Sequence, residues 1–532
     1  MQSSSKSSLQ LYKMFLVVGA FLVIFAHLWK LGALPVGIQP VESSIGYNVL
    51  SLLENGRSEN GVLLPIIFKT IYNYSGPFIP YLASLFFFVF GPSIVTLRLA
   101  SAIMFLVFVC SLTFLLAKIL NVKRNSNNTT QCYPLIFLIL AAGFLPWTFP
   151  LSRVTFDDIA VLPLIGLSLF FLYKTYHQEY TGVVSALIAG ALLGFSIYAS
   201  TTTKIVPFLS IPIIGIFYFR KETLLKSTGF IAAFVVVIIP YFIYSTLYPD
   251  LLLFPISSDS YLFDANLSFL EKIWLFLSLF FRHVSFDFLV WEGDADRIRH
   301  IGYGGELFIT VFLLFLVEVS ALLFSPKMKP RHPFHVFLFV LFIISVIPAA
   351  LFQSKAPHAG RSILMCISIL LLAGMGFGYI LDHTKKQYQH LLAVFVVGTL
   401  ALEISLYSFQ YFSSYPEQSN RTIGNGGFIS ALQDAIDAQP LNRVLVLPHW
   451  STSWDYHNYY FLKRVLPNPN HVTINHADIF EDAAQANFLH NTCFVLADSE
   501  NESWTQWIQT LDEPLPEKTH EQSFENAHVF CY

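Results

Sequence analysis

The sequence predicts a polytopic α-helical membrane protein with a small α/β domain at its C-terminal end. Three observations support this fold class. The 532-residue chain is 55% hydrophobic and only 12% charged, about half the charged share of a typical soluble protein. Long apolar runs recur throughout the first part of the chain, and from about Ser413 the composition becomes that of a soluble domain. The net charge of −3 gives no sign of a nucleic-acid partner.

Runs of about 20 apolar residues are long enough to cross a bilayer as helices. We find about eleven such runs, near residues 14–34, 94–118, 133–149, 158–175, 182–199, 203–219, 227–247, 304–324, 334–352, 363–381 and 391–411. The first run is too long for a signal-peptide core and has no evident cleavage site, so we expect a retained span. Together the runs predict a membrane domain over residues 1–411.

Two further helices are expected outside the membrane core. The apolar segment from Pro77 to Gly91 is short and contains two prolines, which favours an interfacial or re-entrant helix over a span. Within Pro40–Gly61, Ile45, Val49 and Leu52 recur at helical spacing. This segment is therefore expected to lie along the membrane surface.

Charges in the short loops set the predicted orientation. If the N-terminus is cytoplasmic, the loops on that side are basic, as the positive-inside rule requires. Their basic residues are Lys123, Arg124, Lys174, Arg220, Lys221, Lys226, Lys327, Lys329, Arg331, Lys385 and Lys386. The longer and more polar loops then lie outside with the C-terminal domain. We therefore expect the chemistry at the outer face of the cytoplasmic membrane.

Residues 412–532 alternate between helical and strand-like patterns, which is typical of a small α/β domain. FISALQDAIDA has helical periodicity, and RVLVLP, HVTINHAD, CFVLAD and HVFCY read as strands. Cys493 and Cys531 lie in two of these strands. An extracytoplasmic location would let them form a disulfide; the alternative is two buried thiols.

The predicted outer segments occur in a recognisable order. They are PVESSIGYNVLSLLENGRSENGVLLPIIF, SGPFIPYLASLFFFVFGPSIVTLRLASAI, LSRVTFDDIAVLP, FLVWEGDADRIRH and QSKAPHAGRSILM. In order and sidedness they resemble the membrane glycosyltransferases of the protein O-mannosyltransferase and lipid A aminoarabinose transferase type, over about the first 410 residues. The resemblance implies a GT-C fold. It also implies inverting transfer of a sugar from a polyprenyl-phosphate donor to a protein, lipid or polysaccharide acceptor.

The resemblance points to acidic residues for the catalytic role. The family usually carries an Asp-Glu pair in the first outer loop, with the aspartate as the catalytic residue, whereas this chain reads Val41-Glu42. Because the acceptor needs a carboxylate to take its proton, we expect Glu42 and Asp157 to handle the acceptor. Asp158 shares the site or caps the next span. The alternative for Glu42 is a surface acid at the positive end of its helix.

The departing phosphate needs fixed positive charge. The candidates, from two outer loops, are Arg297, Arg299, His300, Lys355, His358 and Arg361. We prefer Arg361 over Lys355 because its neighbours match the family more closely. The alternatives are a solvated loop of mixed charge and snorkelling to lipid headgroups. Arg153 is expected to form an ion pair with Asp157; the alternative is that it holds phosphate.

No cluster of histidine, cysteine and acidic residues has metal-ligand spacing, so no cofactor is expected to be required. Two outer carboxylates that meet in space can nevertheless hold a divalent ion. The expected partners are the polyprenyl-phosphate sugar, its acceptor and membrane lipid. The alternative function is a non-catalytic polyprenyl-phosphate-binding or scaffold protein that has lost the aspartate at Val41. A transporter is least favoured, because no internal repeat is evident.

Overall fold

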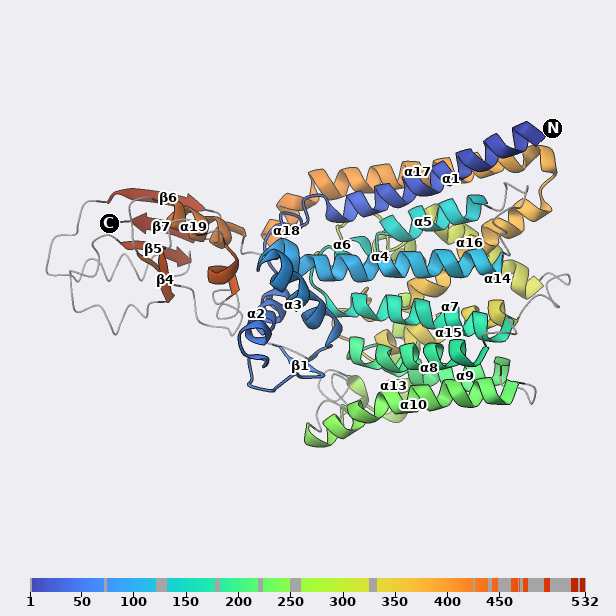
Figure 1. Ribbon diagram of the computed structural model, residues 1–532, viewed down its shortest axis with the longest axis horizontal. Helices are drawn as coiled ribbons and strands as arrows, with labels where there is room; N and C mark the ends of the chain where they lie inside the picture. Colours follow the sequence, from blue (N-terminus) through green and yellow to red (C-terminus); the bar gives the residue numbers. More distant parts are fainter. Residues whose placement is uncertain are drawn as a thin grey trace.

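The computed structural model is a bundle of helices with a small sheet beyond one end (Figure 1). It describes residues 2–70, 74–120, 132–177, 182–218, 223–248, 260–324, 333–423, 426–438, 443–447, 461–466, 468, 472–476, 492–497, 518–524 and 527–531. The basic residues Lys123, Arg124, Arg220, Lys221, Lys327, Lys329 and Arg331 lie outside these ranges.

Every predicted apolar run corresponds to a helix. These helices are α1 (Gln2–Leu28), α4 (Ile94–Ile119), α5 (Tyr133–Phe144), α7 (Val161–His177), α8 (Gly182–Ala199), α9 (Ile205–Tyr218), α10 (Leu224–Leu247), α14 (Ile309–Phe324), α15 (Pro333–Ala350), α16 (Met365–His383) and α17 (Lys386–Ser413). Among the described residues, eight helices are long and apolar enough to cross a membrane. The chain is therefore a multi-pass membrane protein.

A helix that the sequence analysis did not predict lies close to the loops at one end of the bundle. Helix α13 (Phe269–His283) lies within the segment interpreted as a long outer loop. Just before it, the Tyr261 hydroxyl donates to the carbonyl of Ala350 at 2.9 Å, and at its end His283 Nε2 accepts from the His358 amide at 3.0 Å. Both ends of α13 therefore lie near the same end of α15. Although its composition suits a span, the helix does not traverse the bundle.

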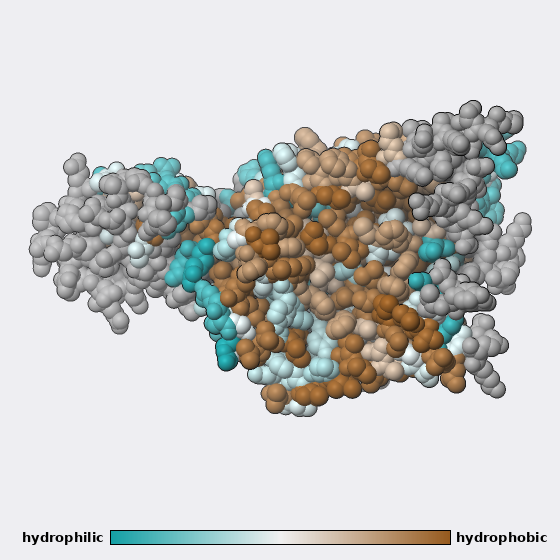
Figure 2. Space-filling model, viewed as in Figure 1, coloured by the Kyte–Doolittle hydropathy of each residue, from teal (hydrophilic) through white to brown (hydrophobic). Residues whose placement is uncertain are grey.

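The polar turns gather at the end of the bundle nearest the sheet. There α2 (Pro40–Asn55) and the short α3 (Phe78–Phe90) pack together, and the N-terminus lies at the opposite end (Figure 1). We call this region, with residues 153–158, 200–204, 293–306 and 352–361, the loop end. Figure 2 shows apolar side chains along much of the bundle and hydrophilic ones around α2. An apolar belt of this kind suits a lipid surround.

Beyond Ser413, α18 (Tyr415–Ile423) and α19 (Gly426–Asp437) lead to a five-stranded sheet. Its strands are β3 (Arg443–Leu447), β4 (Thr473–His476), β5 (Thr492–Ala497), β6 (His520–Phe524) and β7 (Ala527–Cys531), in the order β4-β3-β5-β7-β6. The pairings of β3 with β4 and β5 are parallel. Cys493 and Cys531 face each other on antiparallel β5 and β7 and are joined by a disulfide. Edge strand β6 was not predicted, because its sequence HEQSF lacks apolar alternation.

Helix α2 contacts the C-terminal domain directly. A side-chain carbon at Gly46 would lie 2.3 Å from the Phe461 ring, and Arg464 pairs with Glu54 at 2.8 Å. We expect Gly46→Leu to weaken this contact by about 1–3 kcal/mol, as overpacking usually does. Proteolytic release of the C-terminal domain measures the loss. Gly398→Leu is the control, because its new side chain meets open space. Equal protease resistance of the two variants would contradict this prediction.

Candidate functional site

Glu42 lies in the first turn of α2, which Pro40 begins. Its side chain is fully buried, and both carboxylate oxygens accept hydrogen bonds. Oε1 accepts from Arg98 Nε at 3.0 Å and from the Thr155 amide at 2.8 Å. Oε2 accepts from Arg98 Nη2 at 3.1 Å and from the Gln39 amide at 3.0 Å. Glu42 is thus not a surface acid, and as placed it offers no open oxygen to a substrate.

Arg98, its partner, extends the same network to the chain before α2. Its guanidinium donates to the carbonyls of Leu31, Pro35 and Gly37 at 3.2, 2.9 and 2.6 Å. The ion pair therefore joins the end of the α1 region, the start of α2 and α4. Through the Thr155 amide it also fixes the segment that precedes Asp157.

Arg153 does not pair with Asp157. It is fully buried, and its guanidinium donates to the carbonyls of Ala26 and Trp29 near the end of α1 and to the Tyr411 hydroxyl. Cations are favourable at helix C-termini, where carbonyls lack partners within the helix. The expected ion pair is therefore replaced by a link between α1 and α17.

The two adjacent acids of the predicted second outer turn lie at the loop end. Asp157 begins the short helix η2 (Asp157–Ala160), and it accepts hydrogen bonds from the Ser75 hydroxyl and the Gly76 amide. Its Oδ1 has no hydrogen-bond partner among the described residues. A carboxylate oxygen that lacks a donor can take up a proton from a substrate hydroxyl that reaches it.

Asp158 faces the loop that carries Arg361. It accepts a hydrogen bond from Ser200, and the guanidinium charges of Arg361 and Arg299 act on it. A side-chain carbon at Gly360 would lie 3.5 Å from Asp158 Oδ2. Turns far apart in the sequence thus bring acids and cations together.

Asp294 connects the two predicted phosphate-binding loops. It is buried, pairs with Arg299 at 2.8 Å and accepts from the Ala359 amide at 2.8 Å. Asp296 pairs with Arg299 at 3.0 Å and with the exposed Lys355 at 3.2 Å. These ion pairs lower the pKa of Asp296, although its partial burial opposes the shift. Arg299 and Lys355 therefore already have anionic partners.

Of the two candidate histidines, neither supplies a positive charge near neutral pH. Burial lowers the pKa of His300 to about 4. Burial, together with the charges of Arg299 and Arg361, holds the pKa of His358 well below its usual range. His358 Nδ1 accepts from the Arg361 amide at 3.2 Å, so its role in this geometry is to orient that loop.

The remaining candidates are Arg361 and Arg297. Arg361 is partly buried, lies over the Phe352 ring and donates from Nη1 to the Ser354 carbonyl at 3.1 Å. Arg297 Nη1 is buried without a hydrogen-bond partner among the described residues. Guanidinium groups suit phosphate because they donate in a planar fork.

Two ionisable residues at the loop end were not singled out from the sequence. Lys204 is buried in the turn that also contains Ser200, and burial lowers its pKa to about 8. Glu306 is buried and accepts from the Asp294 amide at 2.8 Å. Burial, with the nearby Asp294 charge, raises the pKa of Glu306 well above its usual range. An acid or a lysine in a polar turn gives no sequence signal of such burial.

No group of three or more histidine, cysteine or acidic side chains within the described ranges is arranged to hold a metal. Divalent-ion binding by two carboxylates stays a prediction. The acids inside predicted spans have partners: Glu318 pairs with His335 at 2.6 Å, and Glu403 accepts from the Thr310 amide at 3.3 Å.

The architecture matches that of solved membrane proteins. No protein-family model matches the chain, and no curated protein shows significant sequence similarity to it. The structure of ArnT from Cupriavidus metallidurans in the apo state aligns over 98% of this chain and 97% of its own, with 12% identity and a TM-score of 0.53. The chain has the GT-C fold. The fold that the resemblance implied is thereby confirmed.

Two further structures align less closely. ArnT from the same organism bound to undecaprenyl phosphate has 13% identity and a TM-score of 0.49, with 98% and 97% of the chains covered. The archaeal oligosaccharyltransferase AglB from Archaeoglobus fulgidus, in complex with an inhibitory peptide and a dolichol-phosphate, has 11% identity and a TM-score of 0.46. Its alignment covers 92% of this chain and 70% of AglB.

Proposed function

We propose that this GT-C protein transfers a sugar from a polyprenyl-phosphate donor to an acceptor hydroxyl or similar nucleophile at the outer face of the cytoplasmic membrane. One observation carries the proposal. At the loop end, Asp157, whose Oδ1 is buried without a hydrogen-bond partner among the described residues, adjoins Asp158, and the charge of the Arg361 guanidinium acts on Asp158. A base and a phosphate-binding cation are the two charges that such a transfer needs.

The proposed reaction is an inverting displacement. Asp157 takes the proton of the acceptor, whose oxygen forms a bond to the anomeric carbon from the face opposite the phosphate. The bond between that carbon and the phosphate oxygen breaks, and polyprenyl phosphate leaves with the electron pair. Arg361 and Arg297 hold the negative charge that develops on the phosphate. Glu42 acts through Arg98 and Thr155 as a positioning residue in this proposal.

A non-catalytic lipid-binding or scaffold protein is the second candidate. The observation that favours it is Val41, which stands where the family usually has its catalytic aspartate. In that case the site would bind polyprenyl phosphate without transferring a sugar.

The deciding experiment uses the purified protein in nanodiscs with a panel of radiolabelled polyprenyl-phosphate sugars and a membrane extract as acceptor. Transfer of label from one donor is the expected result. Donor binding without transfer would favour the scaffold instead. Glu42→Gln is run in parallel: loss of transfer with unchanged thermal stability would identify Glu42 as the base, contrary to the role given to it here.

Arg361→Ala is expected to weaken donor binding. A charge-assisted hydrogen bond is worth about 1.5–3 kcal/mol, so we expect the donor Kd to rise roughly 10- to 100-fold. Binding of a radiolabelled donor to the variant in nanodiscs measures this change. The control is Lys355→Ala, because the Lys355 side chain is exposed and neutralised by Asp296. A larger rise in the donor Kd for Lys355→Ala than for Arg361→Ala would make Lys355, and not Arg361, the phosphate-binding residue.

A further inference from the structure

Helix α18 connects α17, the last helix of the bundle, to the C-terminal domain (Figure 1). Two of its buried side chains bond to other segments. The Tyr415 hydroxyl donates to the Arg297 carbonyl at 3.0 Å, and Ser419 Oγ accepts from the Val36 amide at 3.1 Å. Tyr415 is 2% exposed and Ser419 is 1% exposed. Since residues four apart lie on one face of a helix, one face of α18 is bonded both to the 293–306 loop and to the chain before α2.

Tyr415 is the last of three buried tyrosines, at positions 407, 411 and 415, that follow one another at helical spacing. The rings of Tyr411 and Tyr415 are in contact, with centroids 5.3 Å apart, and the Tyr411 hydroxyl accepts from Arg153. The charges of Arg98 and Asp296 act on Tyr415. The Tyr415 hydroxyl is therefore held by packing beside the charged groups of the loop end.

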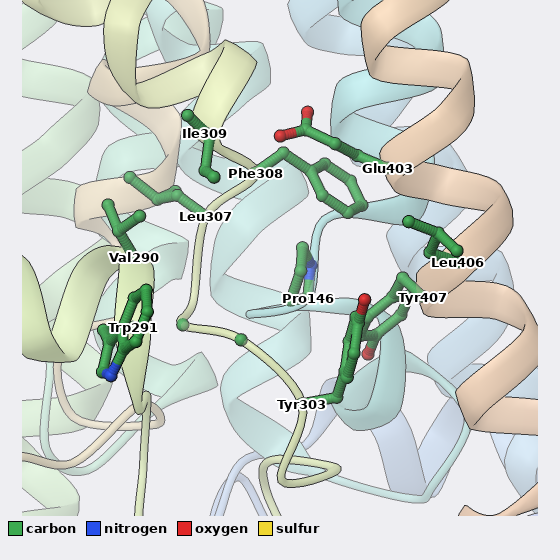
Figure 3. Close-up of a pocket in the computed structure, with 12 residues that line it drawn as sticks. Pro146, Val290, Trp291, Tyr303, Leu307, Phe308, Ile309, Glu403, Leu406 and Tyr407 are labelled. Atoms are coloured by element: carbon green, nitrogen blue, oxygen red, sulfur yellow. The ribbon is translucent and has the colours of Figure 1, made fainter.

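The 293–306 loop is not packed tightly against α17 along its whole length. A pocket of about 470 Å³ lies between α17, the short helix η5 (Asp287–Trp291) and the chain entering α14. Figure 3 shows Tyr303 from this loop and Tyr407 from α17 among the residues around the pocket. Packing alone thus leaves free space beside this part of the loop, whereas the hydrogen bond from Tyr415 ties the loop to the helix at Arg297.

The guanidinium of Arg297 lies over the backbone of its own loop. A side-chain carbon at Gly302, whose φ is +78°, would lie 2.9 Å from Arg297 Cζ. The amides of Arg299 and His300 donate to the Asp296 carbonyl at 2.9 and 3.1 Å, and the Gly302 amide donates to His300 Nδ1 at 3.1 Å. The chain therefore turns tightly around Arg297, and a hydrogen bond that fixes the Arg297 carbonyl also restricts where its guanidinium can lie.

We propose that Tyr415 is a positioning residue for the phosphate of the donor. In the proposed function, on which this role rests, Arg297 holds that phosphate. Tyr415 does not touch the donor; by donating to the Arg297 carbonyl, it keeps the guanidinium in the orientation that meets the phosphate. Because Tyr415 belongs to the helix that leads into the C-terminal domain, the phosphate site is also tied to the position of that helix.

Binding of undecaprenyl phosphate to the full-length protein in nanodiscs tests this role. Tyr415→Phe keeps the ring and removes only the hydroxyl, so we expect the Kd to rise about 2- to 10-fold, as for the loss of one neutral hydrogen bond. Ser419→Ala is the matched control, because it removes an equally buried hydroxyl from the same face of α18 without touching Arg297. We expect this variant to bind undecaprenyl phosphate as the wild type does.

Transfer kinetics separate positioning from a general loss of folded protein. For Tyr415→Phe we expect the donor KM to rise while the rate per folded molecule at saturating donor stays the same. A variant that only folded less well would instead show an unchanged KM and a lower total rate. That second pattern would overturn the role of Tyr415.

A double variant shows whether Tyr415 acts through Arg297. If it does, Tyr415→Phe/Arg297→Ala binds undecaprenyl phosphate no more weakly than Arg297→Ala alone. Additive effects, or a Kd that Arg297→Ala raises and Tyr415→Phe does not, would overturn the role of Tyr415 and leave the proposed function intact. If Arg297→Ala itself has no effect, the phosphate is held elsewhere and the role of Tyr415 fails. If Arg361→Ala has no effect either, the proposed phosphate site fails as well.

Discussion

Asp157→Asn is expected to slow sugar transfer about 10²- to 10⁴-fold, the usual contribution of a positioned general base. The amide is nearly isosteric with the carboxylate, but it does not take up a proton. The hydrogen bond from the Ser75 hydroxyl can still be accepted by the amide oxygen, so we expect the fold and donor binding to be retained. Initial rates in nanodiscs with saturating donor measure the loss.

Two other Asp→Asn variants test whether the loss of sugar transfer is specific to Asp157. Asp158→Asn removes the carboxylate that faces Ser200 and Arg361, and we expect it to change donor affinity more than the chemical step. Asp287→Asn, on an exposed residue of η5, should leave transfer unchanged. If Asp157→Asn transfers sugar at the wild-type rate, the base is a different residue and the proposed mechanism is wrong.

The helices were predictable because their signal is local. A run of apolar residues long enough to cross a bilayer forms a helix whatever its neighbours are, since backbone groups in lipid must pair within the segment. Helix α13 was not predicted, because Glu271, Lys272 and Arg282 interrupt its apolar residues and the segment was interpreted as a loop. The amphipathic pattern of this segment could have predicted a helix.

The site was predictable only in part, because its geometry depends on contacts between distant segments. The spacing of the spans predicted that Asp157, Asp158 and Arg361 lie in turns on the same side of the membrane, and the structure brings Asp158 near the Arg361 loop. The pairing of Glu42 with Arg98 could not be predicted from the sequence, because Arg98 lies 56 residues away inside an apolar helix. A lone arginine in such a helix is itself a signal that a buried partner exists.

Loss of the Arg98 charge is expected to be the most destabilising single change in the membrane domain. Arg98→Met leaves the Glu42 carboxylate buried without its counter-charge and removes donors from three backbone carbonyls. Breaking a buried ion pair in this way typically costs about 3–5 kcal/mol. We expect a loss of this size in the free energy of unfolding in mixed micelles, or failure to accumulate as folded protein.

The double variant Glu42→Gln/Arg98→Met separates the ion pair from the rest of the network. Removing the second charge relieves the uncompensated carboxylate, so the double variant should be less destabilised than the two single variants summed. It should not recover fully, because the carbonyls of Leu31, Pro35 and Gly37 still lack the guanidinium. Strict additivity would mean that Glu42 and Arg98 do not depend on each other. In that case Glu42 would be available for chemistry, and its place as a positioning residue would have to be given up.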